Sequence, residues 1–371
     1  MRMLFSIGIF YPSQVGGPGN TLYWMGKELV KQGISVTAVV SDRGVSDDFA
    51  PRDQWVDLDG IKIKYIVSGF ISRFFRLAWH TLKEIPTNDV VMLSSFFYKP
   101  NFFVGIAALI GKKRVIWSPR GELLIPRGII KRCYLRLLRS IFGKRVLFHA
   151  TSAEEALAIS QFMGVDAQCV IIPNYMELPE KVNSKSEEKY LLYVGRIVPV
   201  KALENLIQGV AMSNRFNQMG YKLYLAGKNE GAYYDRLLEM ISELGLSQSI
   251  FFKGLVEGEE KESLFAGAKA TLLVSHSENF GNVVIESLAQ GTPVIASKGT
   301  PWRALPENNA GYWIDNSPEE IVQAIDTLLL LSENDYQEMR EQAYQFCTEQ
   351  FDVKKNIDKW LEVINKKDVY E

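Results

Sequence analysis

The sequence has few of the residues that build disulfides or metal centres. Its 371 residues include three cysteines and three histidines. The cysteines are odd in number and scattered, which excludes a disulfide framework and favours a reducing, cytoplasmic compartment. The histidines are too dispersed to form a metal site. These residues are Cys133, Cys169 and Cys347, and His80, His149 and His276.

Long hydrophobic runs are also missing. The longest uninterrupted apolar stretch, Phe102–Gly111, is too short to cross a bilayer. The apolar start, Met1–Phe10, has no small-residue cleavage site, so it is typical of a strand and not of a signal peptide. We therefore expect a soluble protein or one attached peripherally to a membrane.

The sequence has almost no net charge, but its charges are unevenly spread. The formal net charge is -1, so no overall field favours nucleic acid. Residues 61–150 nevertheless hold 17 Lys and Arg against 3 Asp and Glu, whereas residues 301–371 hold 7 against 15. This asymmetry predicts that one half of the molecule meets an anionic surface or substrate.

Short apolar runs alternate with amphipathic stretches, which is typical of an α/β fold with parallel sheets covered by helices. In the first half the expected strands are Leu4–Phe10, Ile34–Ser41, Ile61–Val67, Asp89–Ser95, Arg114–Ser118 and Arg145–Ala150. The expected helices are Asn20–Gln32, Phe102–Ile110, Ile129–Phe142 and Ala153–Phe162, and Gly33 is expected to end the first of them.

The alternation restarts after a polar linker over residues 179–188. The expected strands are Tyr190–Val194, Lys222–Ala226, Ile250–Lys253, Ala270–Val274 and Pro293–Ala296. The expected helices are Ala202–Met212, Tyr234–Leu244, Glu260–Ala266, Asn282–Gln290 and Pro318–Leu331, with two more in the acidic tail from Asp335. Two doubly wound domains should leave a cleft at the carboxyl ends of their strands.

The most informative segment runs from Ser275 to Glu286. Glu278 and Glu286 lie eight residues apart across a turn that contains Gly281. A helix that starts near Asn282 would present the amides of Gly281, Asn282 and Val283 to an anion. Two carboxylates that accept hydrogen bonds, placed on either side of such a turn, suit a nucleotide-sugar, which has hydroxyls at both ends and phosphate between them. The alternative is a pair of ordinary surface glutamates.

A second basic segment, Val194–Lys201, follows the first strand of the second domain. Gly195 lets the chain leave the sheet close to a ligand, and Arg196 and Lys201 can converge on one anion. With the helix amides, these groups could neutralise a departing diphosphate without a metal. The alternative is a solvated loop.

Two loops of the first domain follow strands. The segment from Gly16 through Gly17 to Asn20 could approach a phosphate, although it lacks the GxGxxG spacing and a structural turn is the simpler interpretation. Arg120 could hold an acceptor or a phosphate. The acidic pair Asp57 and Asp59 imitates a metal-binding motif but precedes a strand in a polar turn, so we expect a structural role. His149 lies in an apolar run and is expected to be a core residue.

Basic and aromatic residues are interleaved in two stretches, Phe70–Trp79 and Arg127–Arg145. Such faces suit anionic membrane lipid. The alternative is a solvated helix face. Nucleic acid is disfavoured, since no base-stacking or readout motif accompanies the charge.

Taken together, these motifs resemble glycosyltransferase family 4, the retaining glycosyltransferases of the GT-B fold. The resemblance spans most of the chain. It depends on the order and spacing of four motifs: Gly16-Gly17, Gly195-Arg196 with Lys201, Glu278 with Glu286, and Gly291-Thr292-Pro293-Val294-Ile295.

The resemblance implies a fold of two Rossmann-like domains facing across a cleft, with the last helix crossing back to the first domain. The implied boundaries are an acceptor-binding domain over 1–178, a nucleotide-sugar-binding domain over 179–350 and a returning helix over 351–371.

The resemblance also implies residue roles. Glu278 would contact sugar hydroxyls, Glu286 the ribose, and Arg196 and Lys201 the diphosphate, so Glu278, Arg196 and Lys201 form the expected catalytic set. Other donor contacts would come from Gly17, Leu255, Val256, Phe280, Gly281, Asn282 and Val283. The acceptor contacts would come from Gly16, Asn20 and Arg120. No metal and no cofactor is expected besides the donor, UDP- or GDP-linked.

Two departures from the family pattern matter. The first-domain loop reads Ser118-Pro119-Arg120-Gly121 where many members carry a His facing the donor sugar, which points to Arg120 instead. His276 stands ahead of Glu278 in place of a proline, which leaves donor preference open.

The expected reaction is sugar transfer to an acceptor hydroxyl with retention at the anomeric carbon. A lipid-linked glycan in cell-surface polysaccharide or lipopolysaccharide synthesis, handled at the inner face of the cytoplasmic membrane, is the expected acceptor. Two alternatives stay open: a non-catalytic nucleotide-sugar-binding subunit and a nucleotide-sugar epimerase.

Overall fold

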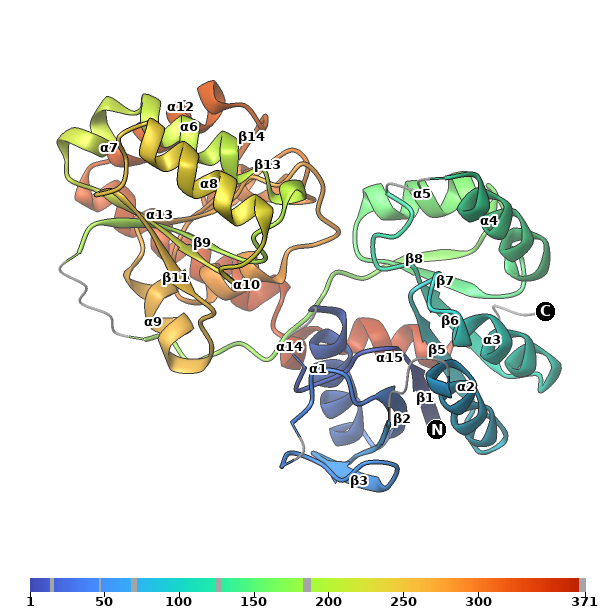
Figure 1. Cartoon of the computed structure of the whole chain (residues 1–371). Helices are drawn as coiled ribbons and strands as arrows, with labels where there is room; N and C mark the ends of the chain where they lie inside the picture. Colours follow the sequence, from blue (N-terminus) through green and yellow to red (C-terminus); the bar gives the residue numbers. More distant parts are fainter. Residues whose placement is uncertain (14–16, 47, 68–71, 125–127, 183–187, 367–371) are drawn as a thin grey trace. The chain divides into compact units, whose positions relative to one another are not determined.

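A computed structural model describes residues 1–13, 17–46, 48–67, 72–124, 128–182 and 188–366. The chain divides into two compact units (Figure 1). Unit 1 comprises Met1–Glu177 together with Val353–Glu371, and unit 2 comprises Leu178–Asp352. The division expected from the sequence fell at 178/179 and 350/351.

Unit 1 is built on an eight-stranded sheet in the order β3-β4-β2-β1-β5-β6-β7-β8. All neighbours pair in parallel except β3 and β4, which form an antiparallel hairpin. The strands are β1 (Arg2–Ser6), β2 (Ser35–Ser41), β3 (Trp55–Leu58), β4 (Ile61–Ile66), β5 (Val90–Ser94), β6 (Arg114–Ser118), β7 (Leu147–Ala150) and β8 (Cys169–Ile171).

Helices cover both faces of this sheet (Figure 1). Because side chains alternate along a strand, Met3 and Phe5 of β1 enter one core while Leu4 enters the other. The first core is closed by α1 (Gly17–Lys31), α14 (Val353–Asn356) and α15 (Asp358–Asn365). The second is closed by α2 (Ser72–Glu84), the 3-10 turn η1 (Ile85–Thr87), α3 (Pro100–Ile110), α4 (Ile129–Phe142) and α5 (Ala153–Met163).

The C-terminal segment returns to unit 1 and is held there by specific contacts. The Val353 amide donates to the Met176 carbonyl at 3.0 Å, and Arg114 Nη2 donates to the Val363 carbonyl at 2.8 Å. Trp360 of α15 packs against His149, with ring centroids 4.7 Å apart and the ring planes tilted by 51°. The expected return of the last helix to the first domain is therefore confirmed.

Unit 2 carries a six-stranded sheet, entirely parallel, in the order β11-β10-β9-β12-β13-β14. Its strands are β9 (Tyr190–Val194), β10 (Lys222–Ala226), β11 (Ile250–Gly254), β12 (Ala270–Leu273), β13 (Val294–Ser297) and β14 (Gly311–Ile314). Its helical segments are η2 (Pro199–Lys201), α6 (Leu203–Met212), α7 (Asn214–Gln218), α8 (Ala232–Glu243), α9 (Gly258–Gly267), α10 (Asn282–Ala289), α11 (Ala304–Glu307), α12 (Pro318–Leu329) and α13 (Glu333–Gln350).

Local sequence explains where many of these helices begin and end. Four serines act as N-caps, each accepting a hydrogen bond from the amide three residues later: Ser152, Ser213, Ser317 and Ser332. Gly33 ends α1 with a positive φ of 79°, as its position predicted.

The predicted α/β fold with two doubly wound units is confirmed, and several strands match to the residue. One expectation was wrong in detail: the first strand ends at Ser6 and not at Phe10. Ile7 and Phe10 are apolar because they pack in the core beyond the sheet. Strands β3, β8 and β14, which are short, were not predicted from the sequence. Among the described residues, the structure contains no helix with the length and hydropathy of a bilayer span.

Candidate active site

Both sheets have a topological switch point, where successive connections turn to opposite sides. In unit 2 this point lies between β9 and β12, because the chain runs from β9 to β10 on one side and reaches β12 on the other. Doubly wound sheets bind ligands in the crevice at this position, beyond the carboxyl ends of the strands. Arg196 and Lys201 follow β9, and Glu278 and Glu286 follow β12. Four of the residues expected to bind the donor thus follow the two strands that flank the switch point.

Lys201 and Glu278 form an ion pair at this crevice. Lys201 is buried at the end of η2, and Glu278 is partly exposed. The next residue, Ala202, has a left-handed conformation with φ of 51° and starts α6. The lysine ammonium is therefore held by a sharp backbone turn and already faces a carboxylate.

The segment after β9 is fixed by close backbone packing. Tyr193 Oη donates to the Arg196 carbonyl at 2.8 Å, and the Gly195 amide donates to Ala226 at 2.9 Å. A Cβ on Gly227 would lie 2.1 Å from the Gly195 carbonyl oxygen, so only glycine fits there. Arg196 itself is exposed.

The loop that carries Glu278 is tied to its neighbours through the backbone. The His276 amide donates to the Val200 carbonyl at 2.9 Å, and the Glu278 amide donates to the Gly299 carbonyl at 2.8 Å. The His276 ring is exposed, and its Nδ1 lies 3.2 Å from Asn316 Nδ2. These bonds join the ends of β9, β12 and β13 into one polar rim.

Helix α10 begins at Asn282, where the sequence predicted its start. Gly281 precedes it with φ of 81°, and a Cβ there would lie 2.6 Å from Leu273 Cδ2. Phe280 is buried against Trp302, whose Nε1 donates to the Phe280 carbonyl at 2.5 Å. No acidic residue lies in the first turn of α10. This helix start suits an anion, with the Phe280 side chain supporting it from beneath.

Glu286 lies in the second turn of α10 and pairs with Lys261 of α9 at 2.7 Å. Lys261 was not among the residues predicted from the sequence to lie at the site. Its only signal was a charge-rich stretch, Glu257–Glu262, which looks like any solvated helix. Leu255 and Val256 precede α9; the former side chain is exposed and the latter is buried.

A pocket of about 280 Å³ lies at the switch point of unit 1, between β1 and β5. Residues after β1, β5 and β6 line it together with the start of α1, and they include Gly8, Gly19, Ser95, Tyr98, Arg120 and Glu122. A Cβ on Gly19 would lie 2.7 Å from the Ile9 carbonyl oxygen, so glycine allows α1 to start against this loop.

Arg120 is the one candidate acceptor residue whose side chain lines this pocket. Its Nη1 donates to Asn174 Oδ1 at 3.0 Å, and its Nε is buried without a hydrogen-bond partner among the described residues. Burial lowers the pKa of the guanidinium to about 10, so it remains a cation at neutral pH. A buried N–H without a partner is costly, and an acceptor group entering the pocket could satisfy it.

The other candidate ligand-binding residues of the first domain do not line this pocket in the part of the chain that the structure describes. Gly17 opens α1 and is exposed, whereas Asn20 Oδ1 is buried without a partner among the described residues. Gly16 lies outside the described residues.

The expected structural roles of the acidic pair and of His149 are confirmed. Asp57 accepts the Gly60 amide at 2.9 Å in the β3–β4 turn, and Asp59 accepts from Tyr23. His149 Nε2 donates to the Ile172 carbonyl at 2.9 Å, so its Nδ1 accepts from Ser118. In the part of the chain that the structure describes, no three His, Cys, Asp or Glu residues gather as a metal site.

Comparison with protein families agrees with this architecture. Residues 15–178 match the model described as Glycosyltransferase Family 4, and residues 175–346 match Glycosyl transferases group 1. The solved structure of Anabaena Alr3699/HepE with UDP and glucose has a TM-score of 0.80 over 98% of this chain and 99% of that one, at 18% identity. WaaG, a glycosyltransferase involved in lipopolysaccharide biosynthesis, has a TM-score of 0.71 at 15% identity over 98% and 100%.

The similarity to these solved structures shows that the fold is that of the two-domain GT-B glycosyltransferases. The two matched family models show that the chain belongs to glycosyltransferase family 4.

The curated relatives match only part of this chain and part of their own length. A poly(ribitol-phosphate) alpha-N-acetylglucosaminyltransferase of Staphylococcus aureus is 25% identical over 58% of this chain and 43% of its own length. A D-inositol 3-phosphate glycosyltransferase of Corynebacterium urealyticum is 31% identical over 38% and 35%. The chain spans less than half the length of these relatives in the matched regions.

Proposed function

We propose that the protein is a retaining glycosyltransferase that moves a sugar from a UDP- or GDP-linked donor to an acceptor hydroxyl. The observation that carries the proposal is the switch point of unit 2. There, Lys201 and Glu278 form a pair beside the exposed Arg196, and Glu286 follows in α10. HepE, which shares the fold, was solved with UDP and with UDP-glucose, and this supports the donor class.

Each group has a role in this proposal. Arg196, Lys201 and the amides of Gly281, Asn282 and Val283 bind the diphosphate. Glu278 accepts hydrogen bonds from sugar hydroxyls, and Glu286 accepts them from the ribose. Leu255 and Val256 contact the base. Gly17 remains a predicted phosphate contact from unit 1.

The pairing of Lys201 with Glu278 suggests how binding and catalysis are linked. As the diphosphate arrives, the ammonium gains a stronger anionic partner, and the Glu278 carboxylate turns to sugar hydroxyls. The ion pair thus holds both groups at the site before the donor binds, and the exchange of partners takes place on binding, ahead of the chemical step.

The chemical step we propose is same-face displacement. The bond from the anomeric carbon to the diphosphate oxygen breaks, and the acceptor oxygen bonds to that carbon from the same face. The acceptor proton passes to the departing diphosphate oxygen, whose negative charge Arg196, Lys201 and the α10 amides stabilise. These groups supply positive charge, so the proposal needs no metal.

We further propose that the acceptor is a lipid-linked glycan bound at the unit 1 pocket, which Arg120 lines. Asn20 and Gly16 remain predicted acceptor contacts. The protein would then act at the inner face of the cytoplasmic membrane, in cell-surface polysaccharide or lipopolysaccharide synthesis. The involvement of WaaG in lipopolysaccharide biosynthesis supports this class. So does the basic balance of residues 61–150.

A panel of UDP- and GDP-sugars tests the donor. A true donor raises the melting temperature by mass action, and transfer to a lipid-phosphate glycan is then followed by NMR to read the anomeric configuration. Inversion of configuration contradicts the proposed chemistry. Binding without transfer to any acceptor favours the binding-subunit alternative, and isotope exchange at sugar C2 without acceptor favours the epimerase.

A further inference from the structure

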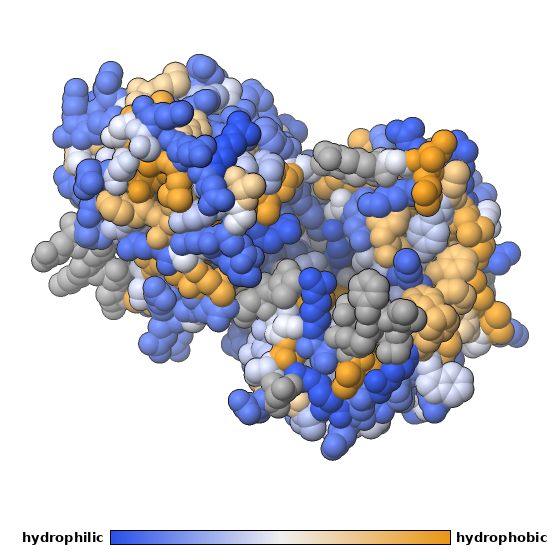
Figure 2. Space-filling model, viewed as in Figure 1, coloured by the Kyte–Doolittle hydropathy of each residue, from blue (hydrophilic) through white to orange (hydrophobic). Residues whose placement is uncertain are grey.

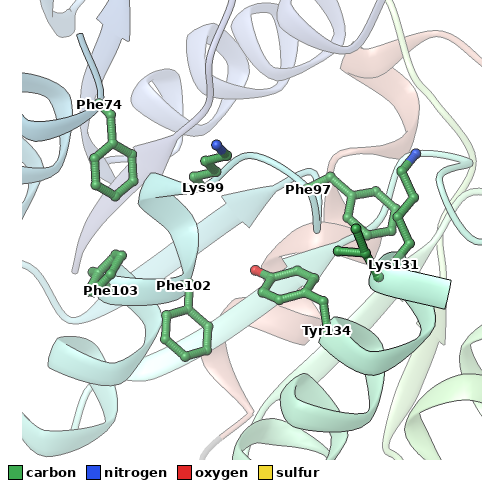
Figure 3. Close-up of a pocket in the computed structure, with 8 residues that line it drawn as sticks. Phe74, Phe97, Lys99, Phe102, Phe103, Lys131 and Tyr134 are labelled. Atoms are coloured by element: carbon green, nitrogen blue, oxygen red, sulfur yellow. The ribbon is translucent and has the colours of Figure 1, made fainter. Parts of the chain in front are cut away.

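Unit 1 contains a second cavity, lined mainly by aromatic side chains, which we call the aromatic groove (Figure 3). Its volume is about 430 Å³, within the range of ~300–1,000 Å³ typical of small-molecule sites. Helices α2, α3 and α4 and the β5–α3 loop supply its apolar lining: Phe74, Phe97, Phe102, Phe103, Ile130 and Tyr134. The sheet does not require such a cavity, since the core beneath α2–α5 is already filled.

Two lysines, Lys99 and Lys131, complete the lining. In Figure 3 the ammonium groups of Lys99 and Lys131 lie apart along one side of the groove with Phe97 between them, and Phe102 and Tyr134 lie at the opposite side. Lys131 Nζ lies 4.6 Å from the centre of the Phe97 ring. No acidic residue is among the lining residues, and α4 carries four basic side chains and no Asp or Glu. The groove is therefore mainly apolar, with two cationic groups and no acidic group in its lining.

The groove is open to solvent despite its composition. Ile130 is 82% exposed, and Phe103 is also exposed. Figure 2 shows apolar side chains gathered on this unit in the region of α3 and α4. A contiguous apolar patch with a polar rim is typical of a binding surface, because leaving it in water is unfavourable.

One loop joins the aromatic groove to the pocket that holds Arg120. Ser95 and Tyr98 line that pocket, whereas Phe97 and Lys99 line the groove. Adjacent residues of an extended chain are about 3.8 Å apart, so the two cavities share this loop as a wall. Glu122 accepts hydrogen bonds from the Phe96 and Phe97 amides at 2.5 and 3.1 Å, which fixes the loop.

We propose that the aromatic groove binds one hydrocarbon chain of a lipid phosphate, with Lys99 and Lys131 contacting the phosphate. The proposal rests on the proposed function for its biological meaning: the lipid is that of the acceptor, and its glycan extends past the β5–α3 loop into the pocket with Arg120. The groove selects a single chain next to an anionic group, and in this it differs from a general affinity for membrane surfaces.

Binding of dodecyl phosphate below its micellar concentration tests the proposal directly, by titration calorimetry at low salt. We expect saturable binding of one molecule per chain, with affinity rising about three- to fourfold per added methylene from octyl to dodecyl phosphate. Inorganic phosphate alone should not compete, and uncharged dodecyl maltoside should bind at least tenfold more weakly.

Matched substitutions locate the site. Ile130→Asp should weaken dodecyl phosphate at least tenfold, whereas Ile110→Asp, at a residue 78% exposed on α3 and outside the groove, should leave it unchanged. Lys131→Ala should weaken binding several-fold, and Arg132→Ala on the same helix should have a smaller effect. Both isoleucines are exposed, so neither variant should alter the melting temperature strongly.

Several results would overturn the proposal. They are equal losses for Ile130→Asp and Ile110→Asp, binding to anionic vesicles without binding to monomeric dodecyl phosphate, or a shift from dimer to monomer on Ile130→Asp. Nucleotide-sugar binding is measured on the same samples. If the wild-type protein transfers sugar but does not bind dodecyl phosphate, only the groove proposal is contradicted. If it binds dodecyl phosphate but transfers no sugar, only the proposed function is contradicted.

Discussion

Units 1 and 2 place their candidate sites at the same point of the same kind of sheet, but they prepare those sites differently. In unit 2 the site carboxylates are each paired with a lysine, Glu278 with Lys201 and Glu286 with Lys261. In unit 1 the Arg120 guanidinium lines the pocket, and its Nε has no hydrogen-bond partner among the described residues; an aromatic groove lies next to the pocket. Unit 2 is therefore suited to a highly charged ligand that exchanges ion-pair partners, and unit 1 to one with both polar and apolar parts.

The difference also has an energetic side. A partly buried carboxylate or ammonium is stabilised by an oppositely charged partner. Removing one member of the pair leaves the other as an uncompensated, partly desolvated charge, which lowers the stability of the folded protein. Substitutions in unit 2 should thus affect both ligand binding and the apo protein. Those at exposed positions of unit 1 should affect ligands alone.

The largest effect is expected for Lys201→Ala. Sugar transfer should slow by a factor of about 10²–10³, because the ammonium group that stabilises the charge of the departing diphosphate is lost. Steady-state rates with saturating donor measure it. Lys298→Ala, which removes an exposed pair with Asp315, is the control and should keep normal turnover. Normal turnover in Lys201→Ala would contradict its assignment.

Glu286→Ala should weaken nucleotide binding by about 10- to 100-fold, since a hydrogen bond to a charged acceptor contributes about 1.5–3 kcal/mol. Calorimetric titration with the nucleoside diphosphate measures the change. Glu259→Ala, an exposed residue of α9, is the matched control. If Lys261 only positions Glu286, Lys261→Met should raise the dissociation constant less than Glu286→Ala does; an equal or larger effect would point to direct contact by Lys261.

Gly281→Ala should reduce the free energy of unfolding by about 2–4 kcal/mol. The residue has φ of 81°, and the added methyl group would lie 2.6 Å from Leu273. Gly220→Ala is a sharp control, because Gly220 has φ of 70° but nothing within 4 Å of the added atom. It should cost only about 1 kcal/mol. Urea unfolding compares the two, and equal losses would mean that packing at the start of α10 is loose.

The smallest effect concerns acid stability in unit 1. Burial and the nearby Arg120 lower the pKa of His149 to about 3 in the folded protein. The imidazole therefore binds a proton more readily when unfolded, so its contribution to stability is complete above pH ~6.5 and is lost as the pH falls from there toward ~3. His149→Gln should flatten the fall in melting temperature between pH 7 and 4. An unchanged slope would show that other groups control it.

Much of the fold could be predicted because buried parallel strands are continuous apolar runs. Tyr190–Val194 and Lys222–Ala226 were predicted to the residue for this reason. The missed strands lack that signal: β3 is an antiparallel hairpin strand that is mostly half-buried, and β8 has two exposed residues. Ile7 was wrongly predicted to lie in the first strand, because it is apolar and packs in the core just beyond the end of the sheet.

The backbone geometry around the candidate site was predictable where local sequence determines it. Gly281 and Asn282 marked the start of α10, and the loop after β9 marked Lys201. The pairing of Glu286 with Lys261 could not be predicted, since it depends on how α9 packs beside α10. The aromatic groove could not be predicted either. Its residues come from α2, α3 and α4, and only the folded sheet brings them together.

The return of α14 and α15 to unit 1 has a consequence for biosynthesis. Val353, Ile357, Trp360 and Ile364 belong to the same hydrophobic cluster as β1 and α1, which the ribosome makes first. The earliest strand must wait for some of its neighbours until every residue of unit 2 has been translated, whereas unit 2 is contiguous and can close its interior earlier. A released chain that ends at Asp352 should therefore leave unit 1 open to protease while unit 2, which is then complete, resists it.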